Sequence, residues 1–172
     1  MTMKLRPIEP ADAPFLREML YEAVYWRSIA TGTAPPMDEA LAEPDVRRAV
    51  DDLGDWDGDA AVVAVVRGKR AGAAWYRFWT DDNHIRGHIE EGIPALVIAV
   101  HRNYRRRGVG QKLIEWLLDH AAEQGVAKMS LMVSKDNHAL RLYETCGFRH
   151  HADCGDSVLM LREVSRDRSR TG

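Results

Sequence analysis

One stretch constrains the fold more than any other, residues Pro94–Leu118, which read as a strand, a basic loop and a helix. Ala95–Val100 is a short apolar run rich in β-branched residues, as an interior strand requires. A loop of three arginines and two glycines follows, from Arg105 to Gly110. Apolar residues then recur at helical spacing, at Val109, Leu113, Trp116, Leu117 and Ala121. The stretch therefore predicts a buried strand that leads through a tight turn into an amphipathic helix.

The loop before this helix has the chemistry of an anion site. A helix start offers unpaired backbone N–H groups and the positive end of the helix dipole. Gly108 and Gly110 let the backbone approach a ligand closely, and the arginines add positive charge. A phosphate or pyrophosphate is the natural guest; an ordinary strand-to-helix turn with solvated arginines is the alternative. The loop lacks the lysine and hydroxyl pair of the G-x-x-x-x-G-K-S/T motif, which disfavours a nucleoside triphosphate with Mg²⁺.

Length and composition bound the other possibilities. The 172 residues suit one domain, which we expect to span residues 1–165, with a disordered tail over residues 166–172. A net charge of −2 creates no global field for nucleic acid, and no apolar run reaches the roughly 18 residues of a membrane span. Two isolated cysteines, Cys146 and Cys154, indicate a reducing cytoplasm and are too few for a structural metal site. We therefore expect no metal, no membrane partner and no nucleic-acid partner.

Strand and helix signals along the chain give the order strand, helix, helix, three strands, helix, strand, helix, strand. A β-α-β unit implies two parallel strands with a right-handed crossover. The expected fold class is therefore α/β (α+β), with a central mixed sheet flanked by helices. Besides the central strand and helix, the expected elements are a strand over Met3–Ile8, helices from Asp12, Asp38 (through Ala42) and Asp45 (through Leu53), a hairpin of Ala60–Val66 with Ala71–Trp79, a strand over Lys128–Ser134, a helix from Asp136 or Asn137 ended by Gly147, and a last strand over Ser157–Leu161.

A second motif begins about thirty residues after the first, where Asn137–Phe148 reads N-H-A-L-R-L-Y-E-T-C-G-F. Together with Arg105-x-x-Gly108-x-Gly110, and in this order, it resembles the GNAT superfamily of N-acetyltransferases, whose motifs are Q/R-x-x-G-x-G/A and N-x-A-L-x-L-Y-E-x-x-G-F. The likeness is sharp over residues 94–149 and points to small bacterial members, mostly of unassigned substrate. It implies a GNAT-like domain that transfers an acetyl group from acetyl-CoA to a primary amine by direct attack in a ternary complex.

The resemblance also implies roles for individual residues. Tyr143 matches the proposed general acid, which protonates the departing CoA thiolate, although its helical spacing alone would suit a core residue. Asn137 matches a residue that touches the pantetheine region. The backbone expected to pair with the pantetheine arm belongs to Ile98, Ala99 and Val100. The expected pyrophosphate cradle comprises Arg105, Arg106, Arg107, Gly108, Val109, Gly110, Gln111 and Lys112.

The amine end is less defined by sequence. An alkylammonium must lose a proton before it attacks a thioester, and related chains often carry Glu where this chain has Ala95. Glu90 and Glu91 are the candidate bases, and three histidines are further candidates: His84, His88 and His101. The candidate acceptor-site residues, several of which equally suit packing on the sheet, are Tyr25, Trp26, Trp75, Arg77 and His84.

The missing glutamate at position 95 leaves a second hypothesis open, a catalytically weak or inactive domain that binds or senses acyl-CoA. Acidic residues in the Thr80–Gly92 loop favour a cationic amine as acceptor, either a small molecule or a peptide. The histidines and acids of this loop lack a recognised metal-ligand spacing. The resemblance suggests a homodimer, for which no sequence feature speaks directly.

Overall fold

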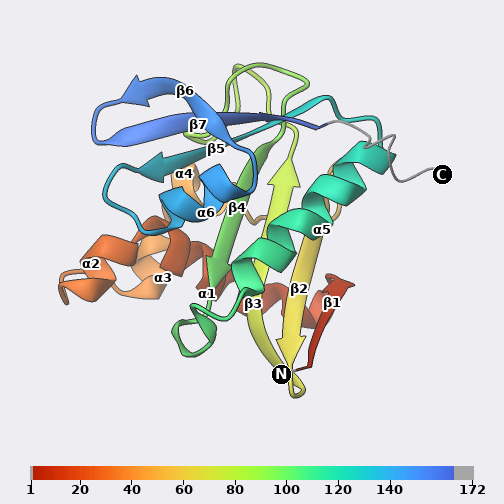
Figure 1. Ribbon diagram of the computed structural model, residues 1–172. Coiled ribbons are helices and arrows are strands. Elements are labelled where there is room, and N and C mark those ends of the chain that lie inside the picture. Colours follow the sequence, from red (N-terminus) through yellow and green to blue (C-terminus); the bar gives the residue numbers. More distant parts are fainter. Residues whose placement is uncertain (1, 165–172) are drawn as a thin grey trace.

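Seven strands form one mixed β-sheet in the computed structural model, which describes residues 2–164 (Figure 1). The strands lie in the order β1-β2-β3-β4-β5-β7-β6, and all neighbours are antiparallel except β4 and β5. The expected tail of residues 166–172 lies outside the described residues. The strands are β1 (Met3–Pro7), β2 (Ala60–Val66), β3 (Lys69–Arg77), β4 (Ala95–Val100), β5 (Lys128–Ser134), β6 (Arg149–Cys154) and β7 (Ser157–Glu163).

Helices cover both faces of this sheet (Figure 1). Helix α5 (Val109–Glu123) packs across β2, β3 and β4 on one face, and α1 (Ala13–Val24) packs against β3 and β4 on the other. None of the helices within residues 2–164 combines the length and the apolar character that a membrane crossing needs. The remaining helical elements are α2 (Trp26–Ala30), α3 (Met37–Ala40), α4 (Pro44–Arg47), α6 (Ala139–Thr145) and two 3₁₀ turns, Pro10–Asp12 and Arg102–Tyr104.

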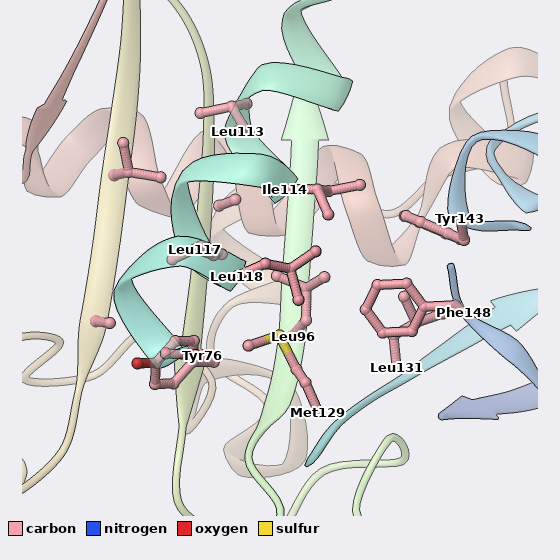
Figure 2. Close-up of a cluster of buried hydrophobic side chains, with 14 of the residues drawn as sticks. Tyr76, Leu96, Leu113, Ile114, Leu117, Leu118, Met129, Leu131, Tyr143 and Phe148 are labelled. Carbon is pink, nitrogen blue, oxygen red and sulfur yellow. The ribbon is translucent and has the colours of Figure 1, made fainter. Parts of the chain in front are cut away.

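The two faces of β3 supply two separate hydrophobic clusters, as its alternating sequence predicts. Ala74 and Tyr76 pack with α5, whereas Ala73 and Trp75 pack with α1. Figure 2 shows the α5 cluster, in which the apolar stripe of the helix lies over the sheet. Phe148, which follows α6 in the chain, belongs to the same cluster. Full burial of a leucine-sized side chain stabilises the fold by about 1.5–3 kcal/mol. The stripe therefore fixes α5, and with it the loop at its start, on the sheet.

Two expectations from sequence are wrong in detail. The strand β6 was not expected, because Arg149–Cys154 is polar, largely exposed and without clear alternation. It forms an edge hairpin with β7, whose own apolar pattern predicts a strand. The helix expected from Asp45 to Leu53 is only the short α4, because carbonyl groups of residues 48, 51 and 52 accept hydrogen bonds from the buried Arg77 guanidinium.

A buried carboxylate joins the N-terminal segment to the sheet. Asp12 is fully buried and accepts hydrogen bonds from Arg6 at 2.7 and 2.9 Å and from Arg70 at 2.7 Å. Hydrogen bonding from Arg6 is the main cause that holds the pKa of the Asp12 carboxyl well below its usual range. The stabilisation is therefore fully present above the unfolded pKa of about 4 and is lost as the pH falls through the folded pKa.

Replacement of Asp12 by asparagine should lower the free energy of unfolding by about 3 kcal/mol at pH 7, because two arginines lose their buried partner. Urea unfolding between pH 7 and 2 should show the difference between variant and wild type shrinking at the acid end. The matched control is Asp153→Asn, an exposed carboxyl whose pKa is also lowered, chiefly by its hydrogen bond with His150. An equal effect of both substitutions would contradict the role of burial.

Candidate active site

Strands β4 and β5 touch at one point and then diverge (Figure 1). Their only pair is Ala95 with Ser130, and the Ser130 N–H donates to the Pro94 carbonyl at 3.0 Å. Beyond this pair, no strand of residues 2–164 pairs with the β5-side edge of β4, which leaves a gap in the strand pairing. We call this gap the β4–β5 splay.

The direction of the peptide groups along β4 can be read from its end. The His101 N–H donates to the Ala71 carbonyl on the β3 side. Because successive peptide groups of a strand point to opposite edges, those of Ala99 also face β3, and those of Ile98 and Val100 face the splay. The Val100 carbonyl accepts from the Arg105 side chain at 3.1 Å. Of the three residues expected to pair with a pantetheine arm, Ile98 and Val100 are placed to do so and Ala99 is not.

The basic loop follows β4 and ends at the open end of the splay. Arg105, Arg106 and Arg107 are exposed, and Arg106 and Gly108 adopt φ angles of +63° and +80°. Gly108 is the N-cap of α5, and a Cβ built on it would meet nothing within 4 Å. The space beside Gly108 is therefore open, and exposed arginines precede the first turn of α5, an arrangement that suits a pyrophosphate.

Gly110 closes the other side of the splay. A Cβ on this buried residue would lie 2.9 Å from Leu142 Cδ2 and 3.7 Å from Val100 Cγ2. A larger residue at position 110 would require the Leu142 side chain of α6 to shift. Gln111 and Lys112 are exposed on the same turn, where both contact Glu115.

Tyr143 and Asn137 belong to α6 and to the turn before it. Tyr143 is 8% exposed and packs edge-on against Phe148. Burial, with a smaller contribution from Cys146, raises the pKa of its phenol above the ordinary value, so the hydroxyl stays protonated and can donate a proton. The Asn137 side chain accepts from the Ala139 N–H at 2.9 Å, and this bond starts α6.

Helices α1 and α2 approach the open end of the splay from the other face. Glu22 forms an ion pair with Arg105 at 3.6 Å, and Arg27 forms one with Asp136 at 2.5 Å. Tyr25 and Trp26 lie between these two anchors and are half-buried. These aromatic residues are therefore placed where an acceptor could enter.

Trp75 and Arg77 do not line this site, which corrects the expectation from sequence. Trp75 is 1% exposed and donates from Nε1 to the Ala49 carbonyl at 2.8 Å. Arg77 is fully buried, pairs with Asp59 at 3.0 and 3.1 Å and lies 3.4 Å above the Trp56 ring. Both side chains are buried against the sheet and do not reach the site. A charged residue such as Arg77 can be buried when all its donors are satisfied.

The Thr80–Gly92 loop meets the splay at its narrow end. A Cβ built on Gly87 would lie 3.4 Å from Ala95 Cβ and 3.4 Å from the Met132 nitrogen. The buried Ser130 hydroxyl donates to the Gly87 carbonyl at 2.6 Å. Gly87 thus sits where β4 and β5 part, a position that no sequence motif indicated.

The candidate bases of this loop differ in their surroundings. Glu90 and Glu91 are exposed, and Glu91 accepts from the Asp81 N–H at 3.4 Å. His84 is exposed and stacks on the His88 ring, with centroids 4.9 Å apart. Elsewhere, His101 accepts from the Asn103 N–H at 3.2 Å as the cap of a 3₁₀ turn. Within residues 2–164, no three His, Cys, Asp or Glu side chains gather as metal ligands.

Comparisons with known proteins agree with this architecture. Over 52 residues the chain is 44% identical to a ribosomal protein bS18-alanine N-acetyltransferase of Escherichia coli, which covers 30% of this chain and 35% of that protein. It is 34% identical over 106 residues to an acetyltransferase of Sodalis glossinidius, which covers 61% and 65% of the two chains. The chain thus spans about a third of the length of the first relative and about two thirds of the second.

A solved structure shares the whole fold. The PaiA N-acetyltransferase of Thermoplasma acidophilum, in complex with coenzyme A, superposes with a TM-score of 0.65 at 15% identity, covering 95% of this chain and 99% of that one. The family model described as the acetyltransferase (GNAT) family matches residues 23–148, which is well over half of the sequence. The chain therefore belongs to the GNAT family of acetyltransferases.

Proposed function

We propose that this protein is an acetyl-CoA-dependent N-acetyltransferase that acts by direct attack of an amine in a ternary complex. The observation that carries the proposal is the β4–β5 splay together with the basic glycine loop at its open end. A strand edge suits the amide groups of a pantetheine arm, and the loop suits its pyrophosphate. Two neighbouring features of one chain thus match two parts of one cofactor.

The chemistry assigns separate tasks to the chain. Residues Arg105–Lys112 hold the cofactor phosphates, and the Ile98 and Val100 peptide groups align the arm beside β4. An N–H on this edge polarises the thioester carbonyl, as in an oxyanion hole. Tyr143 protonates the departing thiolate, and its raised pKa keeps that proton available at neutral pH.

The acceptor is proposed to be a cationic amine. Asp81, Asp82, Glu90 and Glu91 are exposed on the loop beside the splay, and such charges attract an ammonium group. One relative is named for acetylating an alanine of a ribosomal protein, so peptide N-termini belong with polyamines, aminoglycosides and amino acids as test acceptors. A homodimer and a cytoplasmic location stay predictions.

Release of free thiol from acetyl-CoA tests the activity across this set of amines. Turnover that requires both an amine and acetyl-CoA, with mass spectrometry of the acetylated amine, would support the enzyme. Tight acetyl-CoA binding without turnover of any amine would instead favour the second hypothesis, an inactive domain that senses acyl-CoA. The missing glutamate at position 95 is consistent with that hypothesis.

Gly108→Glu should weaken acetyl-CoA binding at least about tenfold, because it places a carboxylate beside the expected phosphate position. Gly108→Ala is the matched control, since it strains the same positive φ without adding charge. Calorimetric titration of both variants separates the two effects. Equal affinities of the glutamate and alanine variants for acetyl-CoA would mean that its phosphates do not bind at this loop.

A further inference from the structure

The residue that follows Gly87 in the chain carries an unpaired nitrogen. The His88 side chain is only 4% exposed, and its Nδ1 is buried without any hydrogen-bond partner. Within residues 2–164 only Trp79 Nε1 shares this condition. Native proteins rarely leave such atoms unsatisfied, and a catalytic role is one of the recognised explanations for an exception.

The other nitrogen of the ring defines its chemistry. His88 Nε2 lies 3.0 Å from the Asp81 carboxylate. An ionised carboxylate accepts hydrogen bonds but donates none, so Nε2 carries the proton in the neutral ring. The lone pair that can take up a proton is therefore on Nδ1, and the carboxylate stabilises the imidazolium that results.

The chain brings His88 within one residue of the narrow end of the β4–β5 splay. A Cβ built on Gly87, the residue before His88, would lie 3.4 Å from Ala95 Cβ and 3.4 Å from the Met132 nitrogen, where the two strands part. The Ser130 hydroxyl anchors it through the Gly87 carbonyl. The side chain of Ala95 points to the same face as Val97 and Ala99, which is the α1 face from which an acceptor would enter.

We propose that His88 is the general base of the transfer and that Asp81 is its positioning residue; this inference rests on the proposed acetyltransferase function. The acceptor ammonium gives one proton to His88 Nδ1, and the free amine attacks the thioester carbonyl. The C–N bond forms and the C–S bond breaks, Tyr143 protonates the thiolate, and the second proton of the former amine restores the phenol. When the product has left, Nδ1 gives its proton to solvent, and the ring regains the neutral form whose Nε2–H donates to Asp81.

This arrangement also accounts for Ala95. A base on the central strand becomes unnecessary when the preceding loop brings an imidazole to the same place. The small Ala95 side chain leaves room for Gly87. A Cβ built on Gly87 would lie only 3.4 Å from Ala95 Cβ.

His88→Gln is the informative variant, because the glutamine amide can still donate to Asp81 but has no basic nitrogen at the Nδ1 position. We expect kcat to fall by about 10²- to 10⁴-fold, with acetyl-CoA affinity and melting temperature nearly unchanged. The loss should be smaller for acceptor amines that are already uncharged at the assay pH. His88→Ala should regain activity when imidazole is added, and Asp81→Asn should show a smaller loss of kcat.

His151→Gln is the matched control, since it removes an exposed imidazole from the edge strand β6. Unchanged kcat in His88→Gln, or a loss that is equal for charged and uncharged amines, would overturn the assignment. So would a greater loss of kcat in Glu90→Gln or Glu91→Gln. A wild-type protein that binds acetyl-CoA but acetylates no amine would instead overturn the proposed function itself, so the two failures are distinguishable.

Discussion

Tyr143→Phe should lower kcat by about 10²- to 10⁴-fold, since the thiolate would leave without a proton donor. The affinity for acetyl-CoA should hardly change, because the phenyl ring preserves the packing against Phe148. Steady-state kinetics with a reactive amine, combined with calorimetric titration of acetyl-CoA, separates these two quantities. The removed atom is a single hydroxyl oxygen, so the melting temperature provides the check on folding.

Tyr76→Phe is the matched control for this prediction. Tyr76 is also a buried tyrosine, and burial raises its pKa to about 12. Figure 2 shows it at the opposite end of the cluster from Tyr143, beneath the far part of α5. An equal loss of kcat in both variants would mean that the hydroxyls support the fold and not the chemistry.

Arg77→Met should cost the fold about 3–5 kcal/mol in free energy of unfolding. The substitution leaves the Asp59 carboxylate buried without its partner and releases the carbonyl groups that Arg77 holds in the 48–52 turns. Urea unfolding followed by tryptophan fluorescence reports on the same region, because Trp56 and Trp79 both lie against the guanidinium.

Two further variants define the cause of that effect. The double variant Arg77→Met with Asp59→Asn should recover part of the lost stability, because the unpaired buried charge is gone. Arg77→Lys should keep the charge but lose the forked contact with Asp59. A loss below about 1 kcal/mol in Arg77→Met would place the pair among ordinary surface ion pairs.

The elements that carry the expected cofactor half of the site follow from local patterns. The apolar run of β4, the glycine at the start of α5 and the helix stripe are each encoded within a few residues, and α5 begins at Val109, so the last two residues of the expected loop belong to the helix. The element order and the mixed sheet are likewise confirmed, apart from β6. An exposed edge strand such as β6 is specified mainly by its partner β7, so its own sequence carries little signal.

The acceptor half depends on contacts between distant residues, which periodicity does not reveal. The strand pattern does not reveal that Arg77 is paired, because its partner Asp59 precedes β2 and lies 18 residues earlier in the chain. The place of Gly87 follows from Ser130, 43 residues later. His88 was one of several loop candidates, and only the fold shows that its Nδ1 is buried and unpaired.

The single pair between Ala95 and Ser130 has a mechanical consequence. Ladders of bonds between strands make a sheet stiff, but here a four-stranded panel, β1 to β4, meets a three-stranded panel, β5 to β7, along one hinge. A ligand that lies along the open edge of β4 supplies hydrogen bonds where the neighbouring strand supplies none. Leu96 of β4 and Leu131 of β5 nevertheless belong to one buried cluster under α5, so side-chain packing and not a ladder of hydrogen bonds holds the two panels together.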